Sequence, residues 1–146
     1  MSGLDAPDIQ EAYKDVRLDN KETNWLLLSY AKAAGDALTL TATGTGGLAE
    51  LAERFDDAQA QYGYARVEYA NDSESRRVKF ILVVWIGKDT RVMRRARVSI
   101  ESGNVKAALA HHSITVDAEE RADIDYEKIV ARLRKAGGAD YNGGRG

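Results

Sequence analysis

The sequence predicts an α+β fold, with one mixed β-sheet lying between helices. The first observation is a run of seven apolar residues, Phe80 to Ile86, which is too short for a core helix and rich in β-branched and aromatic side chains. Such a run is typical of a strand buried on both faces. The second observation is that stretches of period two and stretches of helical spacing follow one another along the chain. A length of 146 residues, 44% of them hydrophobic, fits a single domain.

The order of the elements follows from the local patterns and their turns. In chain order we expect a helix capped by Asp8 and ending near Leu18, strands over 25–30 and 38–43, a short helix over 48–55, strands over 62–70 and from Arg76, a helix from Thr90, a strand over 113–116 and a last helix ended by Gly137 and Gly138. Polar turns, including a loop tip at 71–75, predict two hairpins. Gly103 predicts a kink or a break in the helix from Thr90.

The helix after the buried strand is predicted to expose a basic side. Val92, Met93, Ala96 and Ile100 fall within about a third of a helical turn, which indicates the face toward the core. The arginines at 91, 94, 95 and 97 lie outside that arc, and Asp89 is the one acidic neighbour that we assign to them. We therefore expect this helix to pack through its apolar stripe and to present arginine to solvent.

The net charge of −2 conceals a basic band. Residues 76–97 carry eight Lys or Arg and the single acidic residue Asp89, so the band has a charge of +7 and the rest of the chain −9. A partner responds to the local field rather than to the sum. The band therefore predicts docking onto an acidic protein surface. A nucleic acid is an alternative partner, although no aromatic residues are interleaved with the arginines for stacking on bases.

The patterns for catalysis or metal binding are weak. Without cysteine there is no thiol nucleophile, cysteine metal site or disulfide. His111 and His112 are adjacent, so their side chains diverge and make a poor metal pair. The stretch 43–47 is glycine-rich but lacks the Lys-Ser/Thr of a phosphate loop, and we interpret it as a turn. The acidic residues of 119–125 suit the first turns of the last helix. We expect no enzymatic activity, no cofactor and no metal.

No apolar run approaches the ~20 residues that a membrane span needs. The first residues also lack a basic stretch followed by an apolar core, which a secretory signal would have. Because the absence of cysteine suits a reducing compartment, we expect a cytoplasmic protein without a transmembrane segment.

Three stretches together resemble one protein family. KFILVVWIG at 79–87 precedes the basic helix, LRKAGGADYN stands at 133–142, and AYKDVRLDNKETNWLLLSY at 12–30. In this combination they are similar to the coactosins of the ADF/cofilin-homology (ADF-H) superfamily. The resemblance implies a single ADF-H domain over 4–138, with a five- to six-stranded mixed sheet sandwiched between helices. We expect the remaining residues, 139–146, to form a flexible C-terminal tail.

The resemblance also implies a function and a set of contact residues. It implies binding to the side of filamentous actin (F-actin) in the cytoskeleton without catalysis, and we expect a monomer. Lys79 matches the family's lysine at the start of the buried strand, Arg95 and Arg97 match its basic helix residues, and Lys135 matches its C-terminal lysine. With two neighbouring charges, the expected actin-binding residues are Lys79, Arg94, Arg95, Arg97, Arg134 and Lys135.

One departure from the family pattern narrows the expected activity. The Lys-Met pair typical of the cofilin helix that binds monomeric actin (G-actin) is absent, because Val92 precedes Met93 and arginines follow it. We therefore expect weak or no G-actin binding and no severing, and we consider opposition to filament capping. The alternative is a module whose basic stripe binds another acidic partner, either a nucleic acid or an acidic protein.

Overall fold

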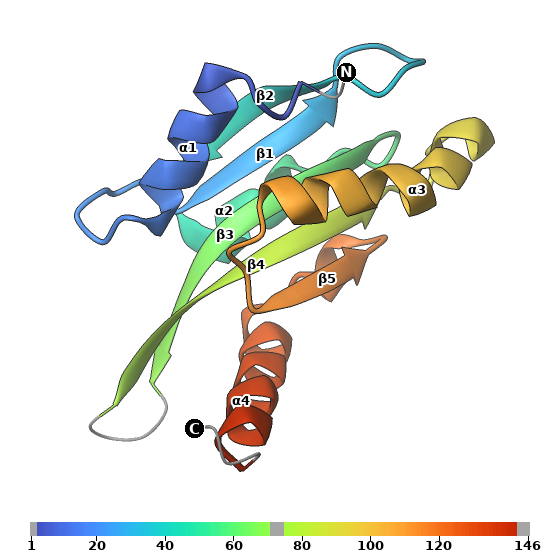
Figure 1. Ribbon diagram of the computed structural model, residues 1–146. Helices are drawn as coiled ribbons and strands as arrows, with labels where there is room; N and C mark the ends of the chain where they lie inside the picture. Colours follow the sequence, from blue (N-terminus) through green and yellow to red (C-terminus); the bar gives the residue numbers. More distant parts are fainter. Residues whose placement is uncertain (1–2, 71–74, 143–146) are drawn as a thin grey trace.

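The computed structural model describes residues 3–70 and 75–142, with side chains described as far as residue 136. In chain order the elements are α1 (Pro7–Arg17), β1 (Trp25–Tyr30), β2 (Leu38–Gly44), α2 (Gly47–Arg54), β3 (Ala60–Ala70), β4 (Arg76–Ile86), α3 (Val92–Ala108), β5 (Ile114–Ala118), the 3-10 turn η1 (Arg121–Asp123) and α4 (Tyr126–Asn142). The predicted α+β class and the predicted order of the main elements are confirmed (Figure 1).

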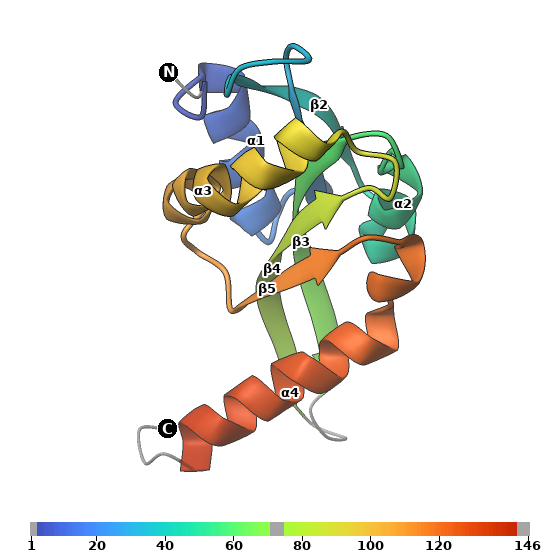
Figure 2. The ribbon, with the colours of Figure 1, turned by 90° about the vertical axis from the view of Figure 1, so that its right-hand side faces the viewer.

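The five strands form one mixed sheet in the order β2-β1-β3-β4-β5. β3 and β4 pair antiparallel from Ala60 with Ile86 to Ala70 with Arg76, and among the strands described only β4 and β5 run parallel. α1 and α3 cover one face of the sheet, and α2 and α4 cover the other (Figures 1 and 2). The sheet is therefore enclosed by helices, as predicted, and it has five strands.

The apolar run of β4 is explained by this enclosure. Phe80, Leu82 and Val84 pack toward α1 and α3, whereas Ile81, Val83 and Trp85 pack toward α2 and α4. Because both faces are covered, no position in the run needs to be polar. The buried indole of Trp85 donates from Nε1 to the carbonyl oxygen of Asp56 at 2.8 Å, so its one polar atom is satisfied.

Three helices differ from their predictions. α1 begins at Pro7 with Ala6 at its N-cap, so Asp8 lies inside the first turn instead of capping the helix. α3 continues through Gly103, where a side chain would meet open space, so the break that we expected as one possibility is absent. Glycine costs only about 1 kcal/mol in a helix interior, which the rest of α3 can offset. Before α4, Glu120 and Asp123 form a capping box around the separate turn η1, so they precede the last helix rather than begin it. Asp125 stands at the start of α4 as expected and caps it, because its Oδ2 accepts from the amide of Lys128 at 3.0 Å.

α4 also ends later than predicted. It passes Gly137 and Gly138 and reaches Asn142, so 139–142 are helical. Residues 143–146 lie outside the described residues, and the flexibility of the tail at 139–146 and the domain boundary at 138 stay predictions. The predicted loop tip at 71–75 likewise falls, except for Ser75, outside the described residues.

Candidate functional site

Helix α3 presents the face that the sequence pattern assigned to the core. Val92, Met93 and Ile100 are 78%, 74% and 79% exposed, and Ala96 is exposed between them. The buried residues of the helix are Arg94, Val98, Ser102 and Val105, which share a helical stripe on the other side. The predicted orientation of α3 is therefore wrong. We call the exposed residues Val92, Met93, Ala96, Arg97 and Ile100 the α3 face.

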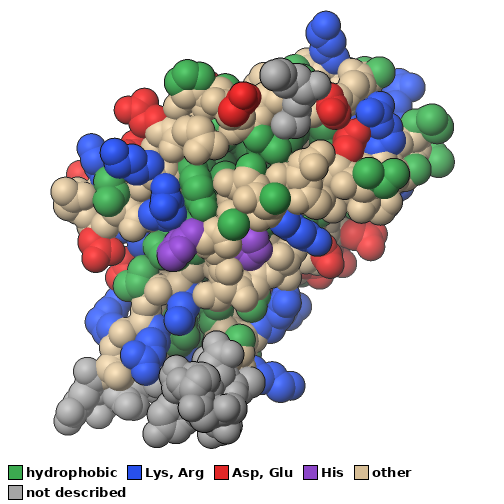
Figure 3. All heavy atoms as spheres, in the orientation of Figure 1, with side chains coloured by type: hydrophobic (Ala, Val, Ile, Leu, Met, Phe, Trp, Pro, Cys, Tyr) green, Lys and Arg blue, Asp and Glu red, His purple; other side chains and the backbone are tan. Residues whose placement is uncertain are grey.

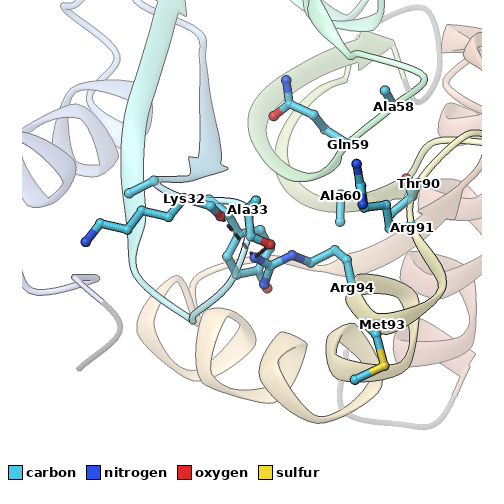
Figure 4. Close-up of a pocket in the computed structure, with 11 residues that line it drawn as sticks. Lys32, Ala33, Ala58, Gln59, Ala60, Thr90, Arg91, Met93 and Arg94 are labelled. Carbon is cyan, nitrogen blue, oxygen red and sulfur yellow. Dashed lines mark hydrogen bonds between the residues drawn. The ribbon is translucent and has the colours of Figure 1, made fainter.

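Arg94 can be buried because its neighbours satisfy the guanidinium. Its side chain is 9% exposed and reaches the turn between β1 and β2, residues 31–36 (Figure 4). There the Nη atoms donate to the carbonyl oxygens of Gly35, Ala33 and Lys32 at 2.8, 3.0 and 3.2 Å. The guanidinium carbon also lies 3.7 Å from the centroid of the Tyr30 ring. The predicted exposure of Arg94 is thus wrong, because the side chain faces the sheet.

Arg95 and Arg97 are also engaged within the chain. Arg95 is half-buried, and its Nη2 donates to the carbonyl oxygens of Gly87 and Lys88 at 2.9 and 3.1 Å, so it holds the loop between β4 and α3. Arg97 is 45% exposed, and its Nη2 lies 2.9 Å from Oε2 of Glu101, one helical turn further on. Glu101 also lies 3.5 Å from Arg94. The expectation that Asp89 is the only acidic neighbour of these arginines is therefore wrong.

Lys79 and the α4 residues lie elsewhere. Lys79 is half-buried in β4 and pairs with Val67, so its side chain is on the face covered by α2 and α4. Arg134 is exposed, and its Nη2 donates to the carbonyl oxygen of Ala70 at 2.8 Å, which ties α4 to the end of β3. Lys135 beside it is exposed. We call Lys79, Arg134 and Lys135 the hairpin patch.

The structure divides the predicted basic band into two parts. Ala70, which Arg134 contacts, pairs with Arg76 at the beginning of β4, whereas Arg95 contacts Gly87 just beyond the end of β4. At about 3.3 Å per residue, Lys79 and Gly87 are roughly 25 Å apart along the strand. Figure 3 shows Lys and Arg spheres over the hairpin end of the sheet and hydrophobic spheres over the first turns of α3.

A hollow of about 410 Å³ lies beside the start of α3, between the β1–β2 turn and the loop before β3 (Figure 4). Its lining residues are Tyr30, Ala31, Lys32, Ala33, Ala58, Gln59, Ala60, Thr90, Arg91, Met93 and Arg94. Burial, together with Tyr62 and Glu101, raises the pKa of Tyr30, so its phenol stays protonated at neutral pH. The described residues of this lining offer neither a carboxylate nor an imidazole, and so no pair for general acid–base chemistry.

The glycine-rich stretch at 43–47 serves as a turn into α2. The amide of Gly46 donates to Oε1 of Glu50 and that of Gly47 to Oδ1 of Asn24, both at 2.9 Å, so these groups are occupied by the chain itself. The hydrogen bonds from Gly46 and Trp25 hold the pKa of Glu50 below its usual value. This arrangement supports the interpretation of the stretch as a turn rather than a phosphate loop.

The histidines lie at the surface between α3 and β5. His112 makes local contacts, with Nδ1 2.7 Å from the carbonyl oxygen of Leu109. Across residues 3–70 and 75–136 no three His, Cys, Asp or Glu side chains come together as a metal site would require. Among the helices that the structure describes, none combines the length and apolar character needed to cross a membrane.

An enclosed five-stranded sheet with a long helix exposed beside its central strand is the architecture of the ADF-H domain. The family model described as cofilin/tropomyosin-type actin-binding protein matches residues 2–134. The chain therefore belongs to this family of actin-binding proteins. This result confirms the predicted ADF-H domain.

Individual relatives agree with the predicted resemblance to coactosins. Coactosin of Dictyostelium discoideum is 31% identical over 146 residues, which cover 99% of this chain and 98% of that protein. The crystal structure of coactosin from Entamoeba histolytica matches with a TM-score of 0.84 and 28% identity, over 95% of this chain and 100% of that one. The solution structure of mouse coactosin, described as an actin filament binding protein, matches with a TM-score of 0.74 and 25% identity, over 97% and 96%.

Proposed function

We propose that this protein binds the side of actin filaments through the α3 face. The observation that carries the proposal is the exposure of Val92, Met93 and Ile100 on one side of a helix. Large apolar side chains gathered on a surface mark protein contact sites, and a helix face of this kind fits an apolar groove. Arg97 adds a positive charge next to them, which suits an acidic partner surface.

The hairpin patch supplies the second contact of the proposed interaction. By the strand rise, Lys79 stands roughly 25 Å along β4 from Gly87, which precedes α3. Arg134 on α4 contacts Ala70, opposite the first residue of β4. A filament offers neighbouring subunits that can meet both surfaces at once, and two linked contacts strengthen binding well beyond either alone. Lys79 lies on the face of the sheet that α2 and α4 cover, whereas α3 covers the other face, so two neighbouring subunits of a filament suit the two surfaces better than one flat contact would. The description of mouse coactosin as an actin filament binding protein supports the same choice.

The proposed contact residues thus differ from the set expected from sequence. Val92, Met93 and Ile100 are added, and Arg94 is left out because its guanidinium is used inside the protein. Arg95 acts mainly on the loop before α3. We further propose a monomeric, cytoplasmic protein that binds G-actin weakly or not at all and does not sever filaments.

High-speed co-sedimentation with actin filaments at physiological salt tests the proposal. The wild-type protein is expected to pellet with filaments, and Met93→Glu is expected to remain in the supernatant because a carboxylate on the α3 face would be desolvated. Ala49→Glu is the matched control, since it places the same charge on an exposed position of α2 on the other side of the sheet. A wild-type protein that stays in the supernatant while folded would contradict the proposed function.

A further inference from the structure

The guanidinium of Arg94 connects two segments that strand pairing does not hold together. One is the first turn of α3, and the other is the β1–β2 turn at 31–36, which is closed by the Ala31 amide donating to the carbonyl oxygen of Ala37 at 2.8 Å. Three carbonyl oxygens of that turn accept hydrogen bonds from Arg94. A guanidinium can make all three because its donors form a rigid planar fork, which the point charge of a lysine does not provide.

Arg94 is also the first residue of α3 that packs toward the sheet. Val92 and Met93 before it are exposed, and the next buried side chain, Val98, comes four residues later. Arg95 contacts the preceding loop rather than the sheet. The contact of the first turn of α3 with the body of the domain therefore passes mainly through the Arg94 side chain.

Glu101 connects the buried side chain of Arg94 to the exposed α3 face. Its side chain is 12% exposed and lies between Arg94 at 3.5 Å and Arg97 at 2.9 Å. A carboxylate this buried requires paired positive charge, and Arg94 supplies it from the inner side. Tyr30, which stacks on Arg94, contacts the Tyr62 hydroxyl through its own at 2.8 Å. A continuous set of contacts thus runs from the tyrosines of β3 and β1 through Arg94 and Glu101 to Arg97.

We propose that Arg94 is a positioning residue, which together with Glu101 fixes the orientation of the first turns of α3 and so the presentation of the α3 face to its partner. The proposal rests on the proposed function for the identity of that partner. It explains why an arginine occupies an inward position while valine, methionine and isoleucine face solvent. A preorganised face binds more tightly because less ordering is left to binding.

The first experiment needs no actin. Because the chain has no cysteine, spin labels can be attached uniquely at Ala34→Cys in the β1–β2 turn and Ser99→Cys on α3, both at exposed positions. Double electron–electron resonance then measures the distance between the turn and the helix. We expect one narrow distribution in the parent and a clearly broadened one in Arg94→Lys, which keeps the charge and loses the fork. Arg91→Lys, an exposed arginine just before α3, is the matched control.

The second experiment measures filament affinity of the same variants by co-sedimentation, at a temperature where circular dichroism shows each to be folded. Arg94→Lys should bind about fivefold or more weakly, and Arg91→Lys within about twofold of wild type. An arginine with a merely structural role would lower the unfolding temperature but leave both the distance distribution and the affinity of the folded protein unchanged. Either of those unchanged results overturns the proposal.

Two further outcomes keep the inference separate from the proposed function. If Arg94→Lys does not fold, Glu101→Gln replaces it, and an unchanged distribution or affinity in that variant overturns the proposal in the same way. If the wild-type protein does not bind filaments, the proposed function fails. The distance measurement still decides the positioning role, and a narrow distribution in Arg94→Lys then overturns it.

Discussion

The two surfaces at the ends of β4 differ in chemistry. The α3 face presents three large apolar side chains with one arginine beside them, whereas the hairpin patch presents Lys79, Arg134 and Lys135. Burial of apolar side chains supplies affinity that changes little with salt, while exposed charges mainly steer the approach and fix the orientation. We therefore expect the α3 face to supply most of the binding free energy and the hairpin patch to cause most of the salt dependence of binding.

The largest expected effect is on the α3 face. Ile100→Asp should reduce filament affinity by about 2 to 4 kcal/mol, because truncating and charging a central apolar contact has effects of this size. Its stability should stay within about 0.5 kcal/mol of wild type, since Ile100 is 79% exposed. Co-sedimentation and urea unfolding measure the two quantities. Binding that survives this change would remove the α3 face from the interface.

A smaller effect is expected in the hairpin patch. Lys79→Ala should weaken filament binding by about 1 kcal/mol, the usual size for a partly exposed charge at the rim of an interface. The fold should be unaffected, which circular dichroism can confirm. A loss larger than that of Ile100→Asp would reverse the comparison and make the hairpin patch the dominant surface.

The salt dependence of filament binding also distinguishes the two surfaces. Between 50 and 200 mM KCl, wild-type affinity should fall by roughly threefold to tenfold, because screening weakens contacts between exposed charges. The salt dependence of filament affinity should become shallower in a Lys79→Ala/Lys135→Ala double variant. The filament binding that Ile100→Asp retains should have the same salt dependence as wild type. Equal slopes in wild type and the double variant would show that the hairpin patch does not face the acidic surface.

β4 and α3 also show how far sequence analysis reaches. The apolar run of β4 could be predicted because seven residues without a polar break have few alternatives to a strand buried on both faces. α3 has two stripes at helical spacing, one through Val92 and Ile100 and one through Arg94 and Val98, and the first is the more apolar. Which stripe faces the sheet depends on the hydrogen-bond partners of Arg94. These are carbonyl oxygens about sixty residues earlier in the chain, which a local pattern does not indicate.

Part of the candidate site was visible in the sequence and was missed. Glu101 follows Arg97 by four residues, the spacing of a helical ion pair, and this was the available signal for an acidic residue among the arginines. The division of the basic band also had a signal, because a strand from Arg76 to Ile86 before the helix already separates Lys79 from the helix arginines. The contact of Arg134 on α4 with Ala70 had none.

The smallest expected effect distinguishes two neighbours on α4. Arg134 donates to the carbonyl oxygen of Ala70 and lies 5.6 Å from the centroid of the Tyr69 ring, whereas Lys135 is simply exposed in the described structure. Arg134→Ala should therefore lower the free energy of unfolding by about 0.5 to 1 kcal/mol, the usual net value of one hydrogen bond. Lys135→Ala should leave it unchanged.

Comparing Arg134→Ala with Lys135→Ala also distinguishes a structural role from a binding role within the hairpin patch. Both variants remove one positive charge, so an equal loss of filament affinity would show that charge alone matters at this surface. A larger loss in Arg134→Ala is expected, because the contact with Ala70 also ties α4 to the end of β3 beside the start of β4. Urea unfolding and co-sedimentation of the two proteins supply the comparison. An equal free energy of unfolding in the two variants would show that the Arg134 hydrogen bond contributes nothing measurable to stability.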